Sequence, residues 1–88
     1  MAELEILIKG KAANAVEILR RITGKKEPMD VCIMALRVLE WCLAQQALGR
    51  KIVSEDAIDP KGKSIELVDY VHDRSLALSF FEGRDIFQ

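Results

Sequence analysis

The stretch that decides the fold is Pro28–Leu48, which reads PMDVCIMALRVLEWCLAQQAL. Pro28 suits a first helical position, Asp30 falls in the first turn where a carboxylate is favourable, and Gly49 follows as a C-terminal cap. This stretch therefore predicts one long helix. Its apolar residues point in almost every direction, and such a helix must be buried on more than one side. We expect an obligate homodimer with this helix at its centre; the alternative is a monomer whose C-terminal segment wraps around the helix.

The composition indicates one small domain with an apolar interior. The chain has 88 residues, of which 50% are hydrophobic, and a chain of this length is only marginally stable alone. No apolar run reaches the roughly 20 residues that span a bilayer, and Arg37 and Glu40 interrupt the longest one. The N-terminus lacks the basic and then apolar pattern of a signal peptide. We expect a cytoplasmic protein with no membrane span.

The charge is divided between the two parts of the chain. Residues 1–51 contain nine Lys or Arg and six Asp or Glu, whereas residues 52–88 contain four and eight. The front is mildly basic and the tail is acidic. This asymmetry is weaker than the basic footprint of a dedicated nucleic-acid binder.

The sequence offers few candidate catalytic or metal-binding residues. Cys32 and Cys42 lie on the same predicted helix with no metal-type spacing, so we expect reduced thiols that pack as small hydrophobes; an intermolecular disulfide is the alternative. His72, Asp56 and Asp59 are expected to be solvated. Because no nucleophile triad or phosphate-binding glycine loop is present, we expect neither an enzyme nor a cofactor or metal site.

The N-terminal segment Glu3–Lys9, ELEILIK, alternates polar and apolar residues. This period predicts a half-buried strand with Leu4, Ile6 and Ile8 on one face. A lone short strand is not stable, and the next segment is helical. The strand must therefore pair with a distant strand or with its own copy, which is a second, independent indication of a dimer.

A shorter helix is predicted between this strand and the long helix. Asn14 with Glu17 three residues later resembles a capping box. Thr23 and Gly24 end the helix, with the glycine at the position that favours a left-handed conformation. The predicted order is strand, helix, turn and long helix.

At this point the chain resembles the ribbon-helix-helix family of dimeric DNA-binding proteins. The resemblance rests on ELEILIK, on ITGKK at the end of the first helix, on EPMDVCIMALRVLE, and on the Ala35-Leu36 pair, and it covers residues 3–50. It implies a mainly α fold with short β elements and an intertwined homodimer. The expected organisation is a dimerisation and DNA-binding domain (1–50), a β-hairpin (51–71) and a C-terminal extension (72–88).

The resemblance also implies a function, that of a small dimeric repressor whose paired strands enter the major groove. The base-facing residues would be Glu3, Glu5, Leu7 and Lys9. The phosphate contacts would be Lys11, Lys25, Lys26 and the amides that follow Glu27. The dimer core would contain Leu4, Ile6, Ile8, Ile33, Leu36, Leu39, Trp41 and Leu43.

Two acidic residues oppose DNA binding. Glu5 lies near the centre of the expected ribbon, and symmetry would place it there twice against a polyanion. The alternative is that Glu3 and Glu5 form a solvated strand face on a dimer that binds no DNA.

The C-terminal part predicts a hairpin and an extension. Lys51–Glu55 and Ser64–Val71 are prone to form strands, and Asp59–Gly62 carries turn residues between them; the hairpin is expected to cover the end of the long helix. The extension is either a short helix capped by Asp73 or Ser75 or a strand. Its aromatic residues are Phe80, Phe81 and Phe87.

These aromatic residues allow two interpretations. They either dock on the protomer or its twin, or form an acidic-aromatic tail that binds a protein partner. Antitoxins built on the ribbon-helix-helix fold use a C-terminal extension in this way. The alternative function is therefore an antitoxin-like or adaptor-like module with weak or no DNA binding.

Overall fold

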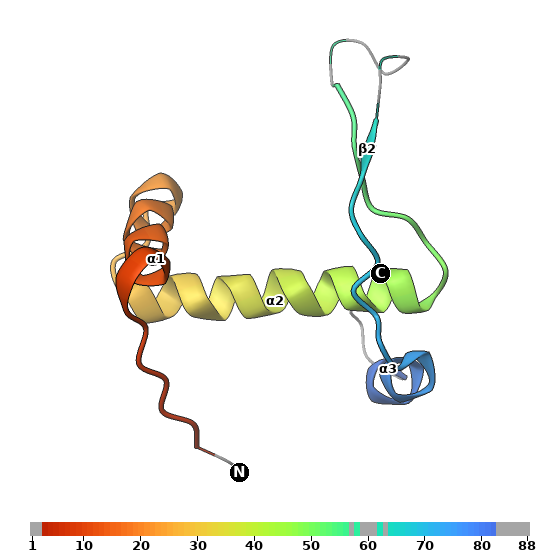
Figure 1. Cartoon of the computed structure of the whole chain (residues 1–88), viewed down its shortest axis with the longest axis horizontal. Helices are drawn as coiled ribbons and strands as arrows, with labels where there is room; N and C mark the ends of the chain where they lie inside the picture. Colours follow the sequence, from red (N-terminus) through yellow and green to blue (C-terminus); the bar gives the residue numbers. More distant parts are fainter. Residues whose placement is uncertain (1–2, 57, 59–61, 63, 83–88) are drawn as a thin grey trace. The chain divides into compact units, whose positions relative to one another are not determined.

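The computed structural model describes residues 3–56, 58, 62 and 64–82. Its elements, in chain order, are α1 (Gly10–Thr23), α2 (Pro28–Ala47), β1 (Val53–Ser54), β2 (Ile65–Glu66) and α3 (Arg74–Phe81) (Figure 1). The fold is mainly helical with a small antiparallel sheet, which confirms the predicted α+β class. The chain divides into two units, Met1–Leu36 and Arg37–Gln88, and the boundary falls within α2.

Residues 3–9 form an extended segment that leads into α1 (Figure 1). They belong to no strand within a single chain. Both of the faces expected from the alternation are exposed, and Leu4 retains 85% of its accessible surface. The pairing of this segment with a second copy stays a prediction.

The first helix begins earlier than predicted. α1 starts at Gly10 with Lys9 as its N-cap, so Asn14 lies inside the helix and the predicted capping box is wrong. Lysine and alanine are strong helix formers, and residues 11–13 extend the helix back past Asn14. Gly10 has a φ of 66°, a left-handed value that a side chain would strain; the chain turns there into the helix.

The end of α1 is as predicted. Gly24 has a φ of 70°, and its N–H donates to the carbonyl of Arg21 at 3.3 Å. The Lys25 N–H donates to the carbonyl of Arg20 at 3.2 Å. These two bonds satisfy carbonyls that the last turn of a helix leaves without partners.

A charged cluster stabilises the middle of α1. The Glu17 carboxylate accepts hydrogen bonds from Nη2 of Arg20 at 2.8 Å and from Nε of Arg21 at 3.2 Å. The bond from Arg20 is the main cause that lowers the pKa of Glu17 from 4.5 to about 2. The same bond raises the pKa of Arg20.

We predict that α1 loses helical content in acid through this cluster. Because the pKa of Glu17 is lower in the folded chain, its contribution is complete above pH 4.5 and is lost as the pH falls toward 2. Far-ultraviolet circular dichroism between pH 6 and pH 2 measures the loss. Glu17→Gln should flatten this part of the profile, and Glu3→Gln is the matched control; an unchanged profile in Glu17→Gln would contradict the prediction.

The long helix agrees with the prediction to within one residue at its C-terminal end. α2 begins at Pro28, carries Asp30 in its first turn, and ends at Ala47. Gly49 has a φ of 81°, and its N–H donates to the carbonyl of Gln46 at 2.9 Å. The predicted glycine cap is confirmed.

Much of the apolar surface of α2 has no cover within one chain. Val31 is buried in the first unit, and Ala44–Ala47 are buried at the C-terminal end. Between them most of the large apolar side chains are exposed; these are Ile33, Leu36, Val38, Leu39 and Trp41. α1 contains no buried residue. Among the described residues, the C-terminal part of the chain thus covers only the last turns of the helix, and most of the apolar side chains before them are exposed.

The hairpin is present but shorter than predicted. Val53 pairs with Glu66 and Ser54 pairs with Ile65 in antiparallel register. The N–H of Leu67 donates to the carbonyl of Ile52 at 2.7 Å and extends the pairing. Of the predicted turn, residues 59–61 lie outside the described residues.

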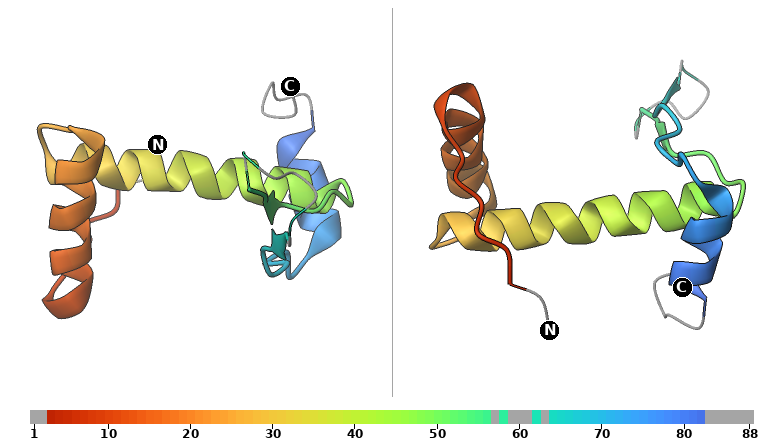
Figure 2. Two further views of the ribbon diagram at one scale, coloured as in Figure 1. Left: turned by 90° about the horizontal axis from the view of Figure 1, so that it is seen from above. Right: turned by 60° about the horizontal axis from the view of Figure 1, so that its bottom comes forward.

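The described part of the C-terminal extension contains a helix, α3 (Arg74–Phe81). α3 has Asp73 as its N-cap, and the Asp73 carboxylate accepts from the N–H of Leu76 at 2.9 Å. This decides between the two predicted caps, because Ser75 lies inside the helix. α3 lies near the C-terminal end of α2 in both views of Figure 2. Phe87 lies outside the described residues.

Candidate interaction surfaces

The loop between α1 and α2 carries two free cations. Lys25 and Lys26 are exposed, and neither forms an ion pair with another described residue. Arg20, by contrast, is engaged by Glu17 and donates to the carbonyl of Lys25 at 3.2 Å. Lys11 is also exposed, in the first turn of α1. The structure places two of the three predicted phosphate-binding lysines together in one loop.

The amino end of α2 offers fewer amides than the resemblance implies. Pro28 has no N–H, and the Asp30 N–H donates to the carbonyl of Glu27 at 3.1 Å. The predicted phosphate binding at this loop would therefore depend more on the lysine side chains than on the helix terminus.

The order of elements in the first unit matches the order predicted from the sequence, with an extended segment in place of the strand. Comparison with family models, curated proteins and solved structures found no match for this chain. The resemblance of residues 3–50 to the ribbon-helix-helix family therefore stays a prediction from the sequence.

The predicted dimer core is mostly exposed in one chain. Its exposed members are Leu4, Ile6, Ile8, Ile33, Leu36, Leu39 and Trp41. Leu43 is half-buried instead, because it lies beside α3. The exposed positions are the ones that a second copy would have to cover.

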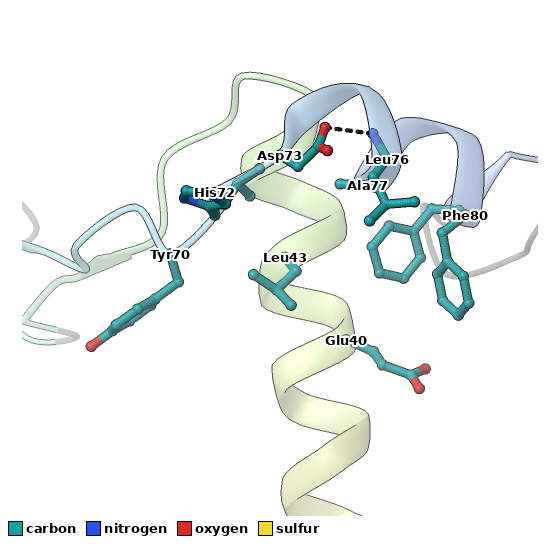
Figure 3. A pocket seen from close by; sticks show the side chains of 10 residues that line it. Glu40, Leu43, Tyr70, His72, Asp73, Leu76, Ala77 and Phe80 are labelled. Atoms are coloured by element: carbon teal, nitrogen blue, oxygen red, sulfur yellow. Dashed lines mark hydrogen bonds between the residues drawn. The ribbon is translucent and has the colours of Figure 1, made fainter.

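A second surface is an open groove between α2 and α3, which we call the α3 groove (Figure 3). Its volume is about 540 Å³. Its lining residues are Glu40, Leu43, Tyr70, Val71, His72, Asp73, Leu76, Ala77, Phe80 and Phe81. The sequence predicted the phenylalanines as a partner-binding tail, with no sign that α2 would supply one wall.

The two phenylalanines of α3 have different surroundings. Their rings meet edge to face with centroids 5.0 Å apart. Phe81 is buried, whereas Phe80 keeps 54% of its surface exposed. Phe81 therefore packs on the protomer, whereas Phe80 lies partly exposed at the groove.

Gln46 holds the wall of the groove in place, a role that sequence analysis missed. Only 4% of Gln46 is exposed. Its Nε2 donates to the carbonyl of Val68 at 3.0 Å, and its Oε1 accepts from the N–H of Tyr70 at 3.0 Å. The side-chain amide thus pairs with the backbone of residues 68 and 70 as a neighbouring strand would. Its own carbonyl accepts a hydrogen bond from Arg74, the first residue of α3.

A smaller depression of about 160 Å³ lies on the same unit, and its cations are hydrogen-bonded or paired to neighbouring side chains. Lys51 meets Glu66 at 3.8 Å, and Arg74 meets Asp69 at 3.0 Å. Arg50 donates to Oε1 of Gln45 at 2.8 Å. Lys51 and Arg74 are thus paired with carboxylates, whereas Arg50 is bonded to a neutral amide.

Other candidate groups are dispersed. Within the described residues, no three His, Cys, Asp or Glu side chains lie close enough to hold a metal ion. Cys32 and Cys42 are free and half-buried rather than buried, because one chain leaves much of α2 uncovered. His72 is exposed, as expected. No helix in the described part of the chain has the length and hydropathy to cross a membrane.

Proposed function

We propose that the chain is a small transcriptional regulator that binds double-stranded DNA as a ribbon-helix-helix homodimer. The supporting observation is the exposure of the apolar residues that this dimer would bury. Leu4 and Ile6 lie on an extended segment with no strand partner, and Leu36 is exposed on α2. Two copies of residues 3–9, paired antiparallel, would satisfy each other's backbone and form the ribbon.

The DNA contacts in this proposal come from the basic half of the chain. A two-stranded ribbon fits the major groove, with Glu3, Glu5, Leu7 and Lys9 toward the bases. Phosphates would be bound by Lys11, Lys25 and Lys26, and the last two have no competing ion pair among the described residues. Glu5 would oppose the phosphates and limit affinity.

Salt titration of binding to mixed-sequence duplex DNA tests the proposal. A dimer with up to six lysine–phosphate contacts should lose about a thousandfold in affinity between 50 mM and 200 mM salt. Lys25→Ala removes two cations per dimer and should flatten the log–log slope by about 1.8. Lys51→Ala is the matched control, because Lys51 lies on the hairpin and pairs with Glu66.

Two outcomes of this titration would contradict the proposal. Absence of binding at 50 mM salt would mean that Glu3 and Glu5 dominate the expected ribbon. If Lys25→Ala and Lys51→Ala gave equal slopes of log affinity against log salt, the loop between α1 and α2 would not be part of the DNA interface.

A second candidate function is that of an antitoxin-like or adaptor-like module that binds a protein partner. The observation that favours it is the α3 groove, because it leaves Leu76 and Phe80 exposed beside a structured wall. Exposed apolar surface with a defined shape is typical of protein-binding sites.

A further inference from the structure

Two oppositely charged residues lie in the middle of the exposed apolar surface of α2. Arg37 is exposed and Glu40 is half-buried, and neither forms a hydrogen bond or ion pair with a described residue. Residues three or four positions apart share one side of a helix, so Leu36 and Trp41 flank the two charges on that side. Both of these apolar residues are exposed. The charges thus lie between apolar side chains that one chain leaves uncovered.

The order of the two charged residues disfavours a bond between them. A pair within a helix is more favourable when the carboxylate precedes the cation, as Glu17 precedes Arg20 and Arg21 in α1. In α2 the order is reversed, because Arg37 precedes Glu40. The Glu40 side chain extends outward from the helix (Figure 3). Both charges are therefore available to another chain.

Two copies of α2 that cross antiparallel would pair these charges. A two-fold axis that passes midway between Arg37 and Glu40 places each of them opposite the other residue of the second copy. Leu36 and Trp41 lie symmetrically about the same point, so they would meet in the same way. A parallel arrangement instead places Arg37 against Arg37 and Glu40 against Glu40. The charge pattern therefore fits only the antiparallel orientation.

Burial of the apolar neighbours makes a partner for each charge important. A dimer that covers Leu36 and Trp41 also takes Arg37 and Glu40 partly out of water, and a charge that loses water without a partner is strongly unfavourable. Ala44–Ala47 are already buried within one chain, so the contact with a second copy would be confined to the middle of α2.

We propose that the two α2 helices of the homodimer cross antiparallel, with Arg37 of each copy paired to Glu40 of the other. This inference rests on the proposed homodimer and specifies its orientation. The occupant of this part of α2 is a second copy, because the surface is complementary in charge to itself. Ion pairs at such a contact mainly select the partner and its orientation, and they add little affinity.

Reversal of one charge tests the pairing. Arg37→Glu opposes carboxylates at both contacts of the dimer, and Glu40→Arg opposes cations. Each variant should raise the dimer Kd about 10-fold at low salt and by less at high salt, where ions screen the charges. Sedimentation equilibrium at about 50 mM and about 500 mM salt measures this change. Lys26→Glu alters the net charge equally at an exposed position outside α2, and it should leave the Kd unchanged.

The double variant with Arg37→Glu and Glu40→Arg tests the orientation. In an antiparallel dimer it should regain the Kd of the original chain, because both ion pairs are restored with their charges exchanged. Mixed with an isotope-labelled original chain, it should form mainly homodimers, since a mixed dimer would oppose like charges at both contacts. A parallel dimer predicts the reverse, a preference for mixed dimers. Native mass spectrometry of the mixture measures the populations.

The outcomes separate the orientation from the homodimer itself. An unchanged Kd in both single variants, or random exchange in the mixture, would overturn the ion pairs but keep the dimer and its DNA binding. Preferred mixed dimers would show parallel helices and overturn the proposal. If the original chain is monomeric, the orientation and the proposed function are both wrong. Circular dichroism checks that each variant retains α2, and if a single variant loses helical content, the mixing experiment decides alone.

Discussion

Leu36→Glu is expected to convert the proposed dimer into a monomer. Leu36 lies on α2 with 61% of its surface exposed in one chain, and the dimer would bury it twice. Burial of one leucine contributes about 1.5–3 kcal/mol, so two copies contribute about 3–6 kcal/mol, and the new carboxylates add a desolvation cost. The dimer Kd should rise by at least about 100-fold. Sedimentation equilibrium across a range of concentrations measures this change.

Ile58→Glu is the control for this experiment. Ile58 retains 95% of its accessible surface and lies outside the predicted dimer core, so its replacement should leave the Kd unchanged. If the Leu36→Glu protein stays dimeric at the same concentrations, the dimer uses another surface. The proposed ribbon-helix-helix dimer would then be wrong. If the monomer instead forms and DNA binding disappears with it, both parts of the proposed function are supported.

Gln46→Ala is expected to loosen the segment that carries the wall of the α3 groove. The substitution leaves the carbonyl of Val68 and the N–H of Tyr70 without their partner. An unsatisfied buried polar group costs about 1–3 kcal/mol, and these groups are only partly buried, so we expect a total loss of about 2–3 kcal/mol. Hydrogen exchange of the Tyr70 amide should become about 30-fold faster or more.

Two variants separate this hydrogen bonding from packing. Gln46→Glu keeps the volume and still accepts from Tyr70, but it places a carboxylate against the carbonyl of Val68; the Tyr70 amide should stay protected while the unit loses stability. Gln45→Ala removes a neighbouring buried glutamine that bonds Arg50, and it should leave Tyr70 unaffected. Unchanged Tyr70 exchange in Gln46→Ala would show that the amide pairing does not hold the segment.

Local signals were sufficient for the C-terminal end of α1 and for both ends of α2. Pro28 and Asp30 lie within α2 and Gly49 lies just beyond its end, so each acts directly on that helix. α2 ends within one residue of the prediction. Gly24 ends α1 for the same reason. The start of α1 was misplaced because the capping preference of Asn14 competed with strong helix formers at residues 11–13.

The second unit was less predictable, and part of it depends on contacts between distant residues. The sequence from residue 72 onward carried signals for both helix and strand. Asp73 favours the helix, because its side chain caps α3. Gln46 gave no local sign of burial, because its partners lie 22 and 24 residues away along the chain.

The sequence by itself determined the helix termini at Gly24, Pro28 and Gly49, the hairpin, and the α+β class, because caps, turns and periodicity act between residues a few positions apart. Only the tertiary structure decided the burial of Gln46, the different environments of Phe80 and Phe81, and the groove between α2 and α3. Those features arise when segments far apart in the chain pack together, and no neighbouring residue specifies which segments meet.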